Sequence, residues 1–233
     1  ARQEPPTVTA MKTALRHALS RRAALAGIAA ATLALAPAAH AQRKDGPAEV
    51  PVEELMKPGD LPELSVGSPD AKVVIVEYAS LTCGHCATFH NKVLPELKAK
   101  YLDTGKARLI MRQFPLNNVD AAAMMLTRCV APDKTIALVD TFYHTQAEWA
   151  FKEGNPVPRL FEMAKQAGFT QETFDKCLTD QPLLDKLTAM RTRASEKFGV
   201  AATPTFFING KRLQASPTLP EFDKVIEPLL PKG

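Results

Sequence analysis

The strongest constraint on the fold is a strand, helix and strand pattern between residues 73 and 114. Val73-Val74-Ile75-Val76 is a β-branched run without polar alternation, which is typical of a central strand covered on both faces. A helix is expected from about Cys83 to Tyr101, ending near Gly105 and kinked at Pro95, and Ala107 to Phe114 is expected to be a second strand. Such a βαβ unit requires a right-handed crossover and a parallel strand pair.

The remaining sequence places more strands around a long helical block. Helical periodicity extends over residues 118–198, and Gly168 and Gly199 are well placed to end helices. The other expected elements are a strand at Leu64–Val66, a turn at Gly67–Asp70, a strand at Thr205–Ile208, a hairpin turn at Asn209-Gly210, a strand at Lys211–Leu213 and a helix at Leu219–Leu230. The predicted class is therefore α/β, with a domain over 62–230 that is interrupted by an all-helical insertion at 118–198.

The N-terminal segment has the features of an export signal over residues 11–41. A basic stretch from Met11 precedes an apolar run of 14 residues, Ala23 to Ala36, and Ala39-His40-Ala41 supplies small residues for cleavage near Ala41. A buried Ala/Leu helix is the alternative, although the run has no amphipathic stripe. Ser20-Arg21-Arg22 also allows a twin-arginine signal. Residues 42–61, which are polar and contain proline, are expected to form an extended, flexible lead.

Charge excludes two classes of partner. Residues 1–41 hold five Lys/Arg and one Asp/Glu, so the remaining 192 residues carry 24 of each sign and a formal net charge of 24 − 24 = 0. The basic excess belongs to the signal and supports neither nucleic-acid binding nor an electrostatic membrane patch. No other run of 18 apolar residues predicts a membrane span.

The four cysteines, at 83, 86, 129 and 177, all follow the signal. An oxidising compartment permits disulfides, and the even number is consistent with two pairs. Cys83 is expected where a strand leads into a helix, so that free backbone N–H groups and the helix dipole favour its thiolate. His85 is a possible cationic donor beside it. Cys86, one turn inward, is expected to be buried and to act as the resolving cysteine.

Three features together resemble a known family. Cys83-Gly84-His85-Cys86 after a buried strand, a helical insertion, and Thr203-Pro204 before a strand are similar to the thioredoxin-fold, DsbA-type periplasmic thiol:disulfide oxidoreductases, over about Leu64 to Leu230. The resemblance implies a periplasmic monomer without a cofactor that oxidises reduced exported proteins. It also implies reoxidation by a DsbB-type membrane quinone oxidoreductase.

The resemblance also assigns further residues. It implies that Pro204 is a cis-proline facing the cysteines and that Thr203 offers its backbone to an extended substrate peptide. Glu77 resembles the buried acid that moves the proton of the inner cysteine, although a solvent-exposed residue at the strand end is the alternative. A structural disulfide between Cys129 and Cys177 is implied, with two isolated core thiols as the alternative.

Some alternatives remain open. The Gly-His dipeptide occurs in protein disulfide isomerases, whereas prototypical DsbA proteins have Pro-His and thioredoxin-type reductants have Gly-Pro, so isomerase or reductase activity is a second possibility. In another class, Cys83, Cys86, His85 and His90 could bind a metal, either as the main function or in metal stress, but a structural zinc site usually needs a second close pair of ligands. Ala87 stands where haem attachment would require histidine. We therefore expect no metal.

Overall fold

The computed structural model describes residues 46–231. The expected signal peptide at 11–41 and the first residues of the expected lead lie outside this part of the chain.

A five-stranded sheet forms the centre of the described part. Its strands are β1 (Leu64–Gly67), β2 (Val73–Ala79), β3 (Ala107–Gln113), β4 (Thr205–Ile208) and β5 (Lys211–Arg212), in the order β1-β3-β2-β4-β5. β2 and β3 run parallel, as predicted, and the other neighbouring pairs are antiparallel. Asn209 and Gly210, which join β4 to β5, both have positive φ (45° and 86°), the backbone that a tight two-residue hairpin needs. The predicted α/β class is confirmed.

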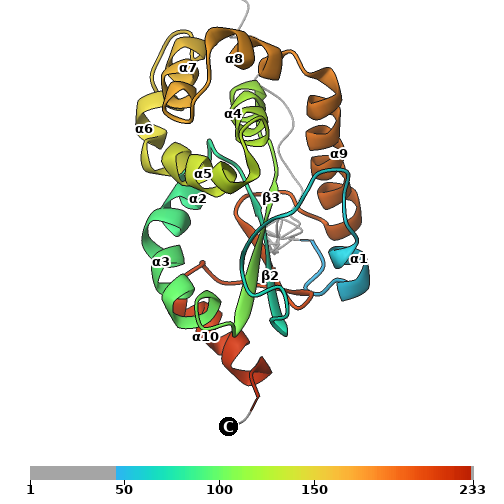
Figure 1. The fold of residues 1–233 in the computed structure, drawn as a ribbon. Helices are drawn as coiled ribbons and strands as arrows, with labels where there is room; N and C mark the ends of the chain where they lie inside the picture. Colours follow the sequence, from blue (N-terminus) through green and yellow to red (C-terminus); the bar gives the residue numbers. More distant parts are fainter. Residues whose placement is uncertain (1–45, 232–233) are drawn as a thin grey trace, which may run out of the picture. The chain divides into compact units, whose positions relative to one another are not determined.

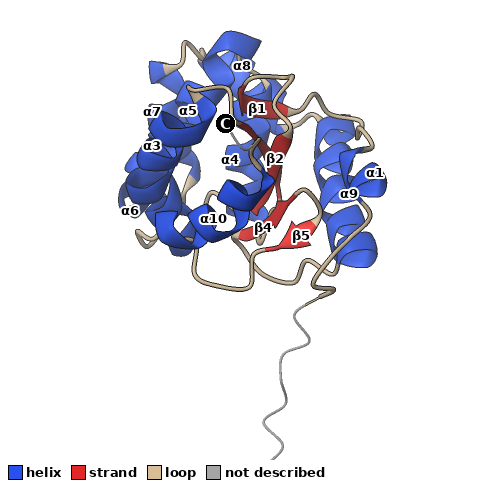
Figure 2. Ribbon diagram, turned by 90° about the horizontal axis from the view of Figure 1, so that it is seen from below, coloured by secondary structure: helices blue, strands red, loops and turns tan. Residues whose placement is uncertain are grey.

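Helices cover both faces of the sheet (Figures 1 and 2). α1 (Val52–Met56) and α9 (Gln181–Phe198) lie on one side, whereas α3 (Leu94–Leu97) and α10 (Leu219–Ile226) lie on the other. Side chains of β2 alternate between two buried clusters: Val76 and Tyr78 belong to one, and Ile75 and Ala79 to the other. A strand buried on both faces explains the continuous apolar run. By the same alternation, Glu77 points to the side of Ile75 and Ala79.

The helical segment after β2 is irregular. α2 (Gly84–Thr88) leads into a π-helical turn at Phe89–Val93, α3 follows, and a second π-helical turn spans Lys98–Leu102. Pro95 lies in the first turn of α3. Because proline has no N–H to donate to the preceding turn, the regular hydrogen-bond pattern is interrupted there. The irregularity expected at Pro95 is thus accompanied by a π-helical turn directly before α3.

The segment between β3 and β4 is helical, as its periodicity predicts. It contains α4 (Asn118–Arg128), a 3₁₀ turn (Pro132–Lys134), α5 (Thr135–His144), α6 (Gln146–Trp149), α7 (Val157–Gln166), α8 (Gln171–Leu178) and α9. Ala194 and Phe198 of α9 pack with Tyr78 and Phe207 of the sheet. The helices therefore share a core with the sheet.

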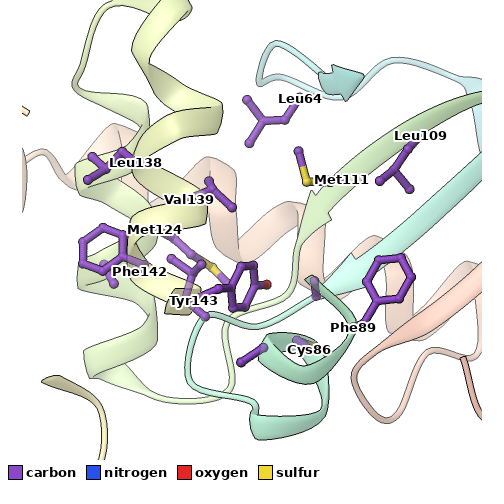
Figure 3. Close-up of a cluster of buried hydrophobic side chains, with 14 of the residues drawn as sticks. Leu64, Cys86, Phe89, Leu109, Met111, Met124, Leu138, Val139, Phe142 and Tyr143 are labelled. Carbon is purple, nitrogen blue, oxygen red and sulfur yellow. The ribbon is translucent and has the colours of Figure 1, made fainter. Parts of the chain in front are cut away.

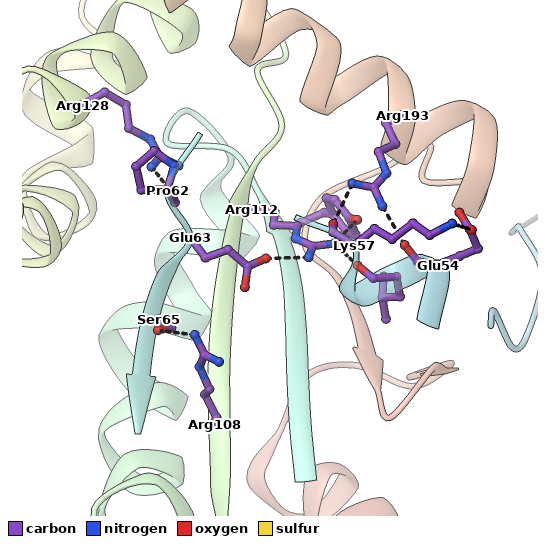
Figure 4. A network of polar contacts seen from close by, with 11 residues as sticks. Glu54, Lys57, Pro62, Glu63, Ser65, Arg108, Arg112, Arg128 and Arg193 are labelled. Carbon is purple, nitrogen blue, oxygen red and sulfur yellow. Dashed lines mark hydrogen bonds and ion pairs between the residues drawn. The ribbon is translucent and has the colours of Figure 1, made fainter. Parts of the chain in front are cut away.

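The described part of the lead, residues 46–61, differs from the extended, flexible segment that was expected. It contains α1, and Val50 and Leu55 are buried at 4% and 1% exposure. Arg193 of α9 donates hydrogen bonds to the carbonyls of Glu54 (2.6 Å) and Lys57 (2.8 Å), and Arg112 of β3 donates to that of Leu55 (2.6 Å) (Figure 4). The expectation followed the polar composition, whereas two apolar residues and these arginines hold the segment against the sheet.

Candidate active site

Cys83 and Cys86 lie where β2 leads into α2. Cys83 is the N-cap of α2, with an extended backbone (φ −88°, ψ 118°) and a partly buried side chain, and Cys86 is fully buried. Both are free thiols in this structure. Figure 3 shows Cys86 among the buried apolar side chains of the cluster that includes Phe89 and Tyr143. One sulfur is therefore partly accessible at the surface while the other lies inside the core.

The two sulfurs have opposite acid strengths. A hydrogen bond from the Cys86 thiol is the largest reason that the pKa of Cys83 is lowered to about 5, and the backbone N–H groups of Cys86 and His85 add to the effect against the opposing influence of burial. Burial, followed by the hydrogen bond to Cys83 and the charge of Glu77, raises the pKa of Cys86 well above its usual range. At neutral pH, Cys83 is a thiolate and Cys86 a thiol.

The Thr203–Pro204 loop faces Cys83. The peptide bond between these residues is cis, and the carbonyl oxygen of Thr203 lies 3.2 Å from Sγ of Cys83. A carbonyl accepts a hydrogen bond from the thiol and so favours its protonated form. The Cys86 thiol, the Thr203 side chain and the backbone amides of α2 together outweigh this effect, because the net pKa is still lowered.

Glu77 and His90 form a buried pair behind the cysteines. The Glu77 side chain is completely buried, so the alternative of a solvent-exposed strand end is wrong. Its Oε2 lies 3.0 Å from Nε2 of His90, whose side chain is 2% exposed. His90 follows Cys86 by one helical turn, and its ring stacks on that of Tyr143 with centroids 4.1 Å apart. From the sequence, His90 was a possible metal ligand or else a helix-surface or packed residue, and nothing indicated its partner, which lies on a different element.

Two buried polar side chains of the helical segment hold the loop before Cys83. Asp120 of α4 accepts hydrogen bonds from the backbone N–H groups of Leu81 (2.8 Å) and Leu116 (2.8 Å). Gln146 of α6 donates to the carbonyls of Leu81 (2.7 Å) and Cys83 (3.0 Å). Three of these four bonds, the two to Leu81 and the one to Cys83, fix the backbone that presents the reactive sulfur.

Both residues were missed from the sequence. Burial raises the pKa of Asp120 to about 6, against the lowering effect of its hydrogen bonds. Asn117 caps α4 by accepting from the backbone N–H of Asp120 (2.9 Å). An Asn followed three residues later by an acid is a recognisable helix start, but nothing in that pattern indicates a contact with residue 81.

Comparison with known proteins places this geometry in a family. The family model for thioredoxin matches residues 60–228. The chain belongs to the thioredoxin family. Among solved structures, alpha-DsbA1 of Wolbachia pipientis is 31% identical, with a TM-score of 0.69, over 76% of this chain and 95% of that one. The resemblance to the DsbA-type branch of the thioredoxin family is therefore confirmed.

Two further relatives define how far the similarity extends. A Rickettsia bellii protein, whose name describes a protein-disulfide oxidoreductase, is 34% identical over 64% of this chain and 57% of its own length. This thioredoxin-family chain thus spans little more than half of that relative. A protein-disulfide isomerase from Novosphingobium aromaticivorans is 26% identical, with a TM-score of 0.62, over 72% of this chain and 97% of that one.

The residues between the two cysteines of this thioredoxin-family site are exposed. The imidazole of His85 was expected to be a cationic donor, but it makes no hydrogen bond with the residues at 46–231, and the backbone N–H of His85 is the group that acts on Cys83. A Cβ added to Gly84 would meet no atom within 4 Å. The position therefore tolerates a side chain.

Cys129 and Cys177 form a disulfide that links the end of α4 to α8, with Cα atoms 6.1 Å apart and a sequence separation of 48. Within residues 46–231, no three His, Cys, Asp or Glu side chains gather as a metal site. No helix in the same range is long and apolar enough to cross a bilayer.

Proposed function

We propose that this chain is a thiol:disulfide oxidoreductase that donates the Cys83–Cys86 disulfide to reduced exported proteins. The observation that carries the proposal is the pairing of opposite acid strengths within one Cys-x-x-Cys unit: the pKa of Cys83 is about 5, and that of Cys86 is raised by burial. A sulfur that is stable as a thiolate is a good leaving group and favours the dithiol state, so the disulfide form is a good oxidant.

The reaction proceeds by two exchanges. A substrate thiolate attacks Sγ of Cys83, the Cys83–Cys86 bond breaks, and Cys86 leaves and takes up a proton. A second substrate thiolate then attacks the substrate sulfur of the mixed disulfide, and Cys83 leaves as a thiolate. The substrate loses two electrons and the cysteine pair gains them. Glu77, buried and coupled by its charge to Cys86, is the group that supplies or accepts the proton.

Substrate binding is assigned to the loop opposite Cys83. Thr203 presents its backbone next to the reactive sulfur, at 3.2 Å from its carbonyl oxygen, and the cis bond to Pro204 sets the direction of the chain there. An extended substrate peptide can pair with this exposed backbone in the manner of an added strand. His85 and Gly84 border the same exposed sulfur.

The cellular setting follows from the sequence. Residues 11–41 are proposed to be a signal peptide cleaved near Ala41, which places a monomeric domain over residues 62–230 in the periplasm. There it would oxidise exported proteins without a cofactor, and a DsbB-type membrane quinone oxidoreductase would restore its disulfide.

Isomerase activity is the second candidate. It is favoured by the Gly-His dipeptide and by the likeness to a solved structure named as a protein-disulfide isomerase. An isomerase must act as a dithiol that attacks wrong disulfides, whereas an oxidase must hold its disulfide until a substrate thiol arrives. Measuring the equilibrium constant for exchange between the Cys83–Cys86 disulfide and glutathione would distinguish an oxidase from an isomerase.

The test has two parts. First, the rate of Cys83 alkylation in the reduced protein is followed from pH 3 to pH 9, and its midpoint is expected near the Cys83 pKa of about 5. Second, Cys86→Ala is expected to accumulate mixed disulfides with reduced client proteins, because the resolving thiol is missing. A midpoint above pH 8, the range of an ordinary thiol, would refute the proposed cause, and failure of Cys86→Ala to trap any client would refute the assigned roles.

A further inference from the structure

A buried acid and a buried imidazole share one hydrogen bond behind Cys86. Nε2 of His90 lies 3.0 Å from Oε2 of Glu77, and the exposed fractions of the two side chains are 2% and 0%. Oε1 of Glu77 and Nδ1 of His90 are both buried without a hydrogen-bond partner in the described part of the chain. Each residue of the pair thus has one atom engaged with the other and one atom free to gain or lose a proton.

We propose that His90 is a positioning residue for the thiol exchange: acting through Glu77, it sets the direction and pH range in which the proton of Cys86 is moved. The proposal rests on the proposed function, and it assigns a role to a residue that neither the Cys-Gly-His-Cys motif nor the cis-proline loop identifies. His90 holds Oε2 of Glu77 and leaves Oε1 as the oxygen available to the Cys86 proton.

Repulsion between two buried negative charges is the physical reason why the Cys86 proton should pass to the Glu77–His90 pair. The charge of Glu77 disfavours a thiolate on Cys86, so the two groups avoid being anions together. When Cys86 becomes a thiolate, its proton therefore stays on the Glu77–His90 pair. The imidazole adds a second proton-accepting atom, Nδ1, beside the carboxylate, so the pair has a place for this proton that an isolated glutamate lacks.

The proton balance is explicit for reoxidation of the reduced protein by oxidised glutathione. Cys83 attacks the glutathione disulfide, forms a mixed disulfide and releases one glutathione thiolate. Cys86 then gives its proton to the Glu77–His90 pair and attacks Sγ of Cys83. The new Cys83–Cys86 bond forms, and the second glutathione leaves as a thiolate. The protein loses two electrons and oxidised glutathione gains two.

The surroundings of His90 support proton exchange at that position. Its ring is stacked on Tyr143 and meets Phe89 edge-on, with centroids 5.4 Å apart, so its orientation is fixed. A cavity of about 20 Å³, lined in part by His90, Tyr143 and Gln113, has room for one water molecule, through which the proton can pass onward.

The other charged and titratable groups around His90 come from four elements and must be considered in any pH profile. They are Glu77 of β2, Cys83 and Cys86 at α2, Arg112 of β3, which lines the same cavity, and Tyr143 and Asp140 of α5. Burial raises the pKa of Asp140, against the lowering effect of the charges of His90 and His144. Asp140 is therefore the nearby group whose titration must be separated from that of the pair.

The test measures the two steps of reoxidation separately. Reduced protein is mixed with oxidised glutathione, quenched with acid at short times, and the mixed disulfide at Cys83 is counted by mass spectrometry between pH 5 and pH 9. In His90→Gln, an amide N–H can still donate a hydrogen bond to Glu77, but the side chain neither takes up nor releases a proton. His144→Gln is the matched control, since it makes the same change at an exposed imidazole that also faces Asp140.

We expect His90→Gln to slow resolution of the mixed disulfide by roughly 100-fold at pH 7, the lower end of the usual contribution of general acid–base catalysis. The first step should change less than about twofold, and the pH profile of the resolution rate should differ from that of the wild type. Glu77→Gln should give a similar loss, and the double variant should be no slower than the slower single one, because the residues act as a unit. His144→Gln should match the wild type.

Three outcomes would overturn the inference. These are a wild-type resolution rate and pH profile in His90→Gln, an equal loss in both steps, or additive losses in the double variant. Failure of the proposed function is recognised differently, because it would appear in the wild-type protein as an ordinary pH dependence of the first step.

Discussion

Replacing Asp120 by asparagine should remove a pH dependence of stability that this buried carboxyl imposes between about pH 4 and pH 6. Asp120 is completely buried, and burial is the main cause that raises its pKa from 3.8 to about 6. Its Oδ1 accepts hydrogen bonds from the backbone N–H groups of Leu81 and Thr82 in the loop before Cys83. The carboxyl therefore stabilises this loop, although burial disfavours its ionised form. This is the opposite of the usual surface carboxylate, whose pKa falls on folding.

The sign and size follow from proton linkage. As the pH falls from about 6 to about 4, the folded protein binds a proton at Asp120 that the unfolded chain does not, so the folded state gains stability. A pKa rise from 3.8 to about 6, at about 1.4 kcal/mol per pKa unit, corresponds to about 3 kcal/mol between neutral pH and pH 4. Asparagine has no such titration. It keeps one acceptor oxygen, but its amide N–H₂ opposes one of the backbone donors, which costs roughly 1–3 kcal/mol at every pH.

The assay is urea unfolding from pH 4 to pH 7, followed by the fluorescence of Trp149, the single tryptophan, which is completely buried. Oxidised protein is used, so that Cys83 does not titrate in the same range. The difference in unfolding free energy between wild type and Asp120→Asn should grow by about 3 kcal/mol as the pH falls from 7 to 4. Parallel curves for the two proteins would refute the claim that burial dominates at this carboxyl.

Two other substitutions give sharp expectations. Gly84→Pro should raise the unfolding free energy by roughly 0.4–1 kcal/mol, because Gly84 opens α2, has free space around it, and follows a residue with the extended backbone that precedes proline. The alkylation midpoint of Cys83 should hardly move, since the groups that lower its pKa are Cys86, Thr203 and the backbone N–H of His85, and a large shift would contradict that assignment. Replacing both Cys129 and Cys177 by alanine should lower the unfolding free energy by about 4 kcal/mol in the chain-entropy model for a separation of 48 residues. Urea titration measures this loss, and an unchanged midpoint would show that the bond constrains little.

Much of the fold follows from local sequence signals. The apolar run at β2 indicates a strand with two covered faces, and the Asn209-Gly210 dipeptide specifies a hairpin turn. These features depend on side-chain period and backbone freedom, which a single sequence displays. The lead was misjudged because its few apolar residues stand among charged residues and prolines, and the burial of Val50 and Leu55 depends on α9, about 140 residues later.

The residues of the candidate site also fall into those that the sequence predicts and those that only the structure shows. Cys83 and Cys86 are placed by their spacing and by the strand before them, so their positions could be predicted. The partners of the loop could not, because Asp120 and Gln146 reach it from helices 38 to 65 residues away in the sequence. His90 is similar, since its bond to Glu77 depends on how the π-helical turn at Phe89–Val93 lies against β2.

These long-range contacts explain why the helical segment matters for the chemistry as well as for stability. A loop that ends in a reactive cysteine has backbone donors and acceptors that strands and helices do not satisfy. Here Asp120 accepts hydrogen bonds from the N–H groups of the loop, and Gln146 donates to its carbonyls. The two side chains thus supply the hydrogen bonds that a neighbouring strand or a helical turn would otherwise make. Because the amides of α2 must meet the sulfur of Cys83 at a fixed distance to keep it ionised, a loop held from both sides preserves the lowered pKa. The helices between β3 and β4 thereby contribute to the acidity of Cys83 although Asp120 and Gln146 bond only to backbone groups of the loop and not to its sulfur.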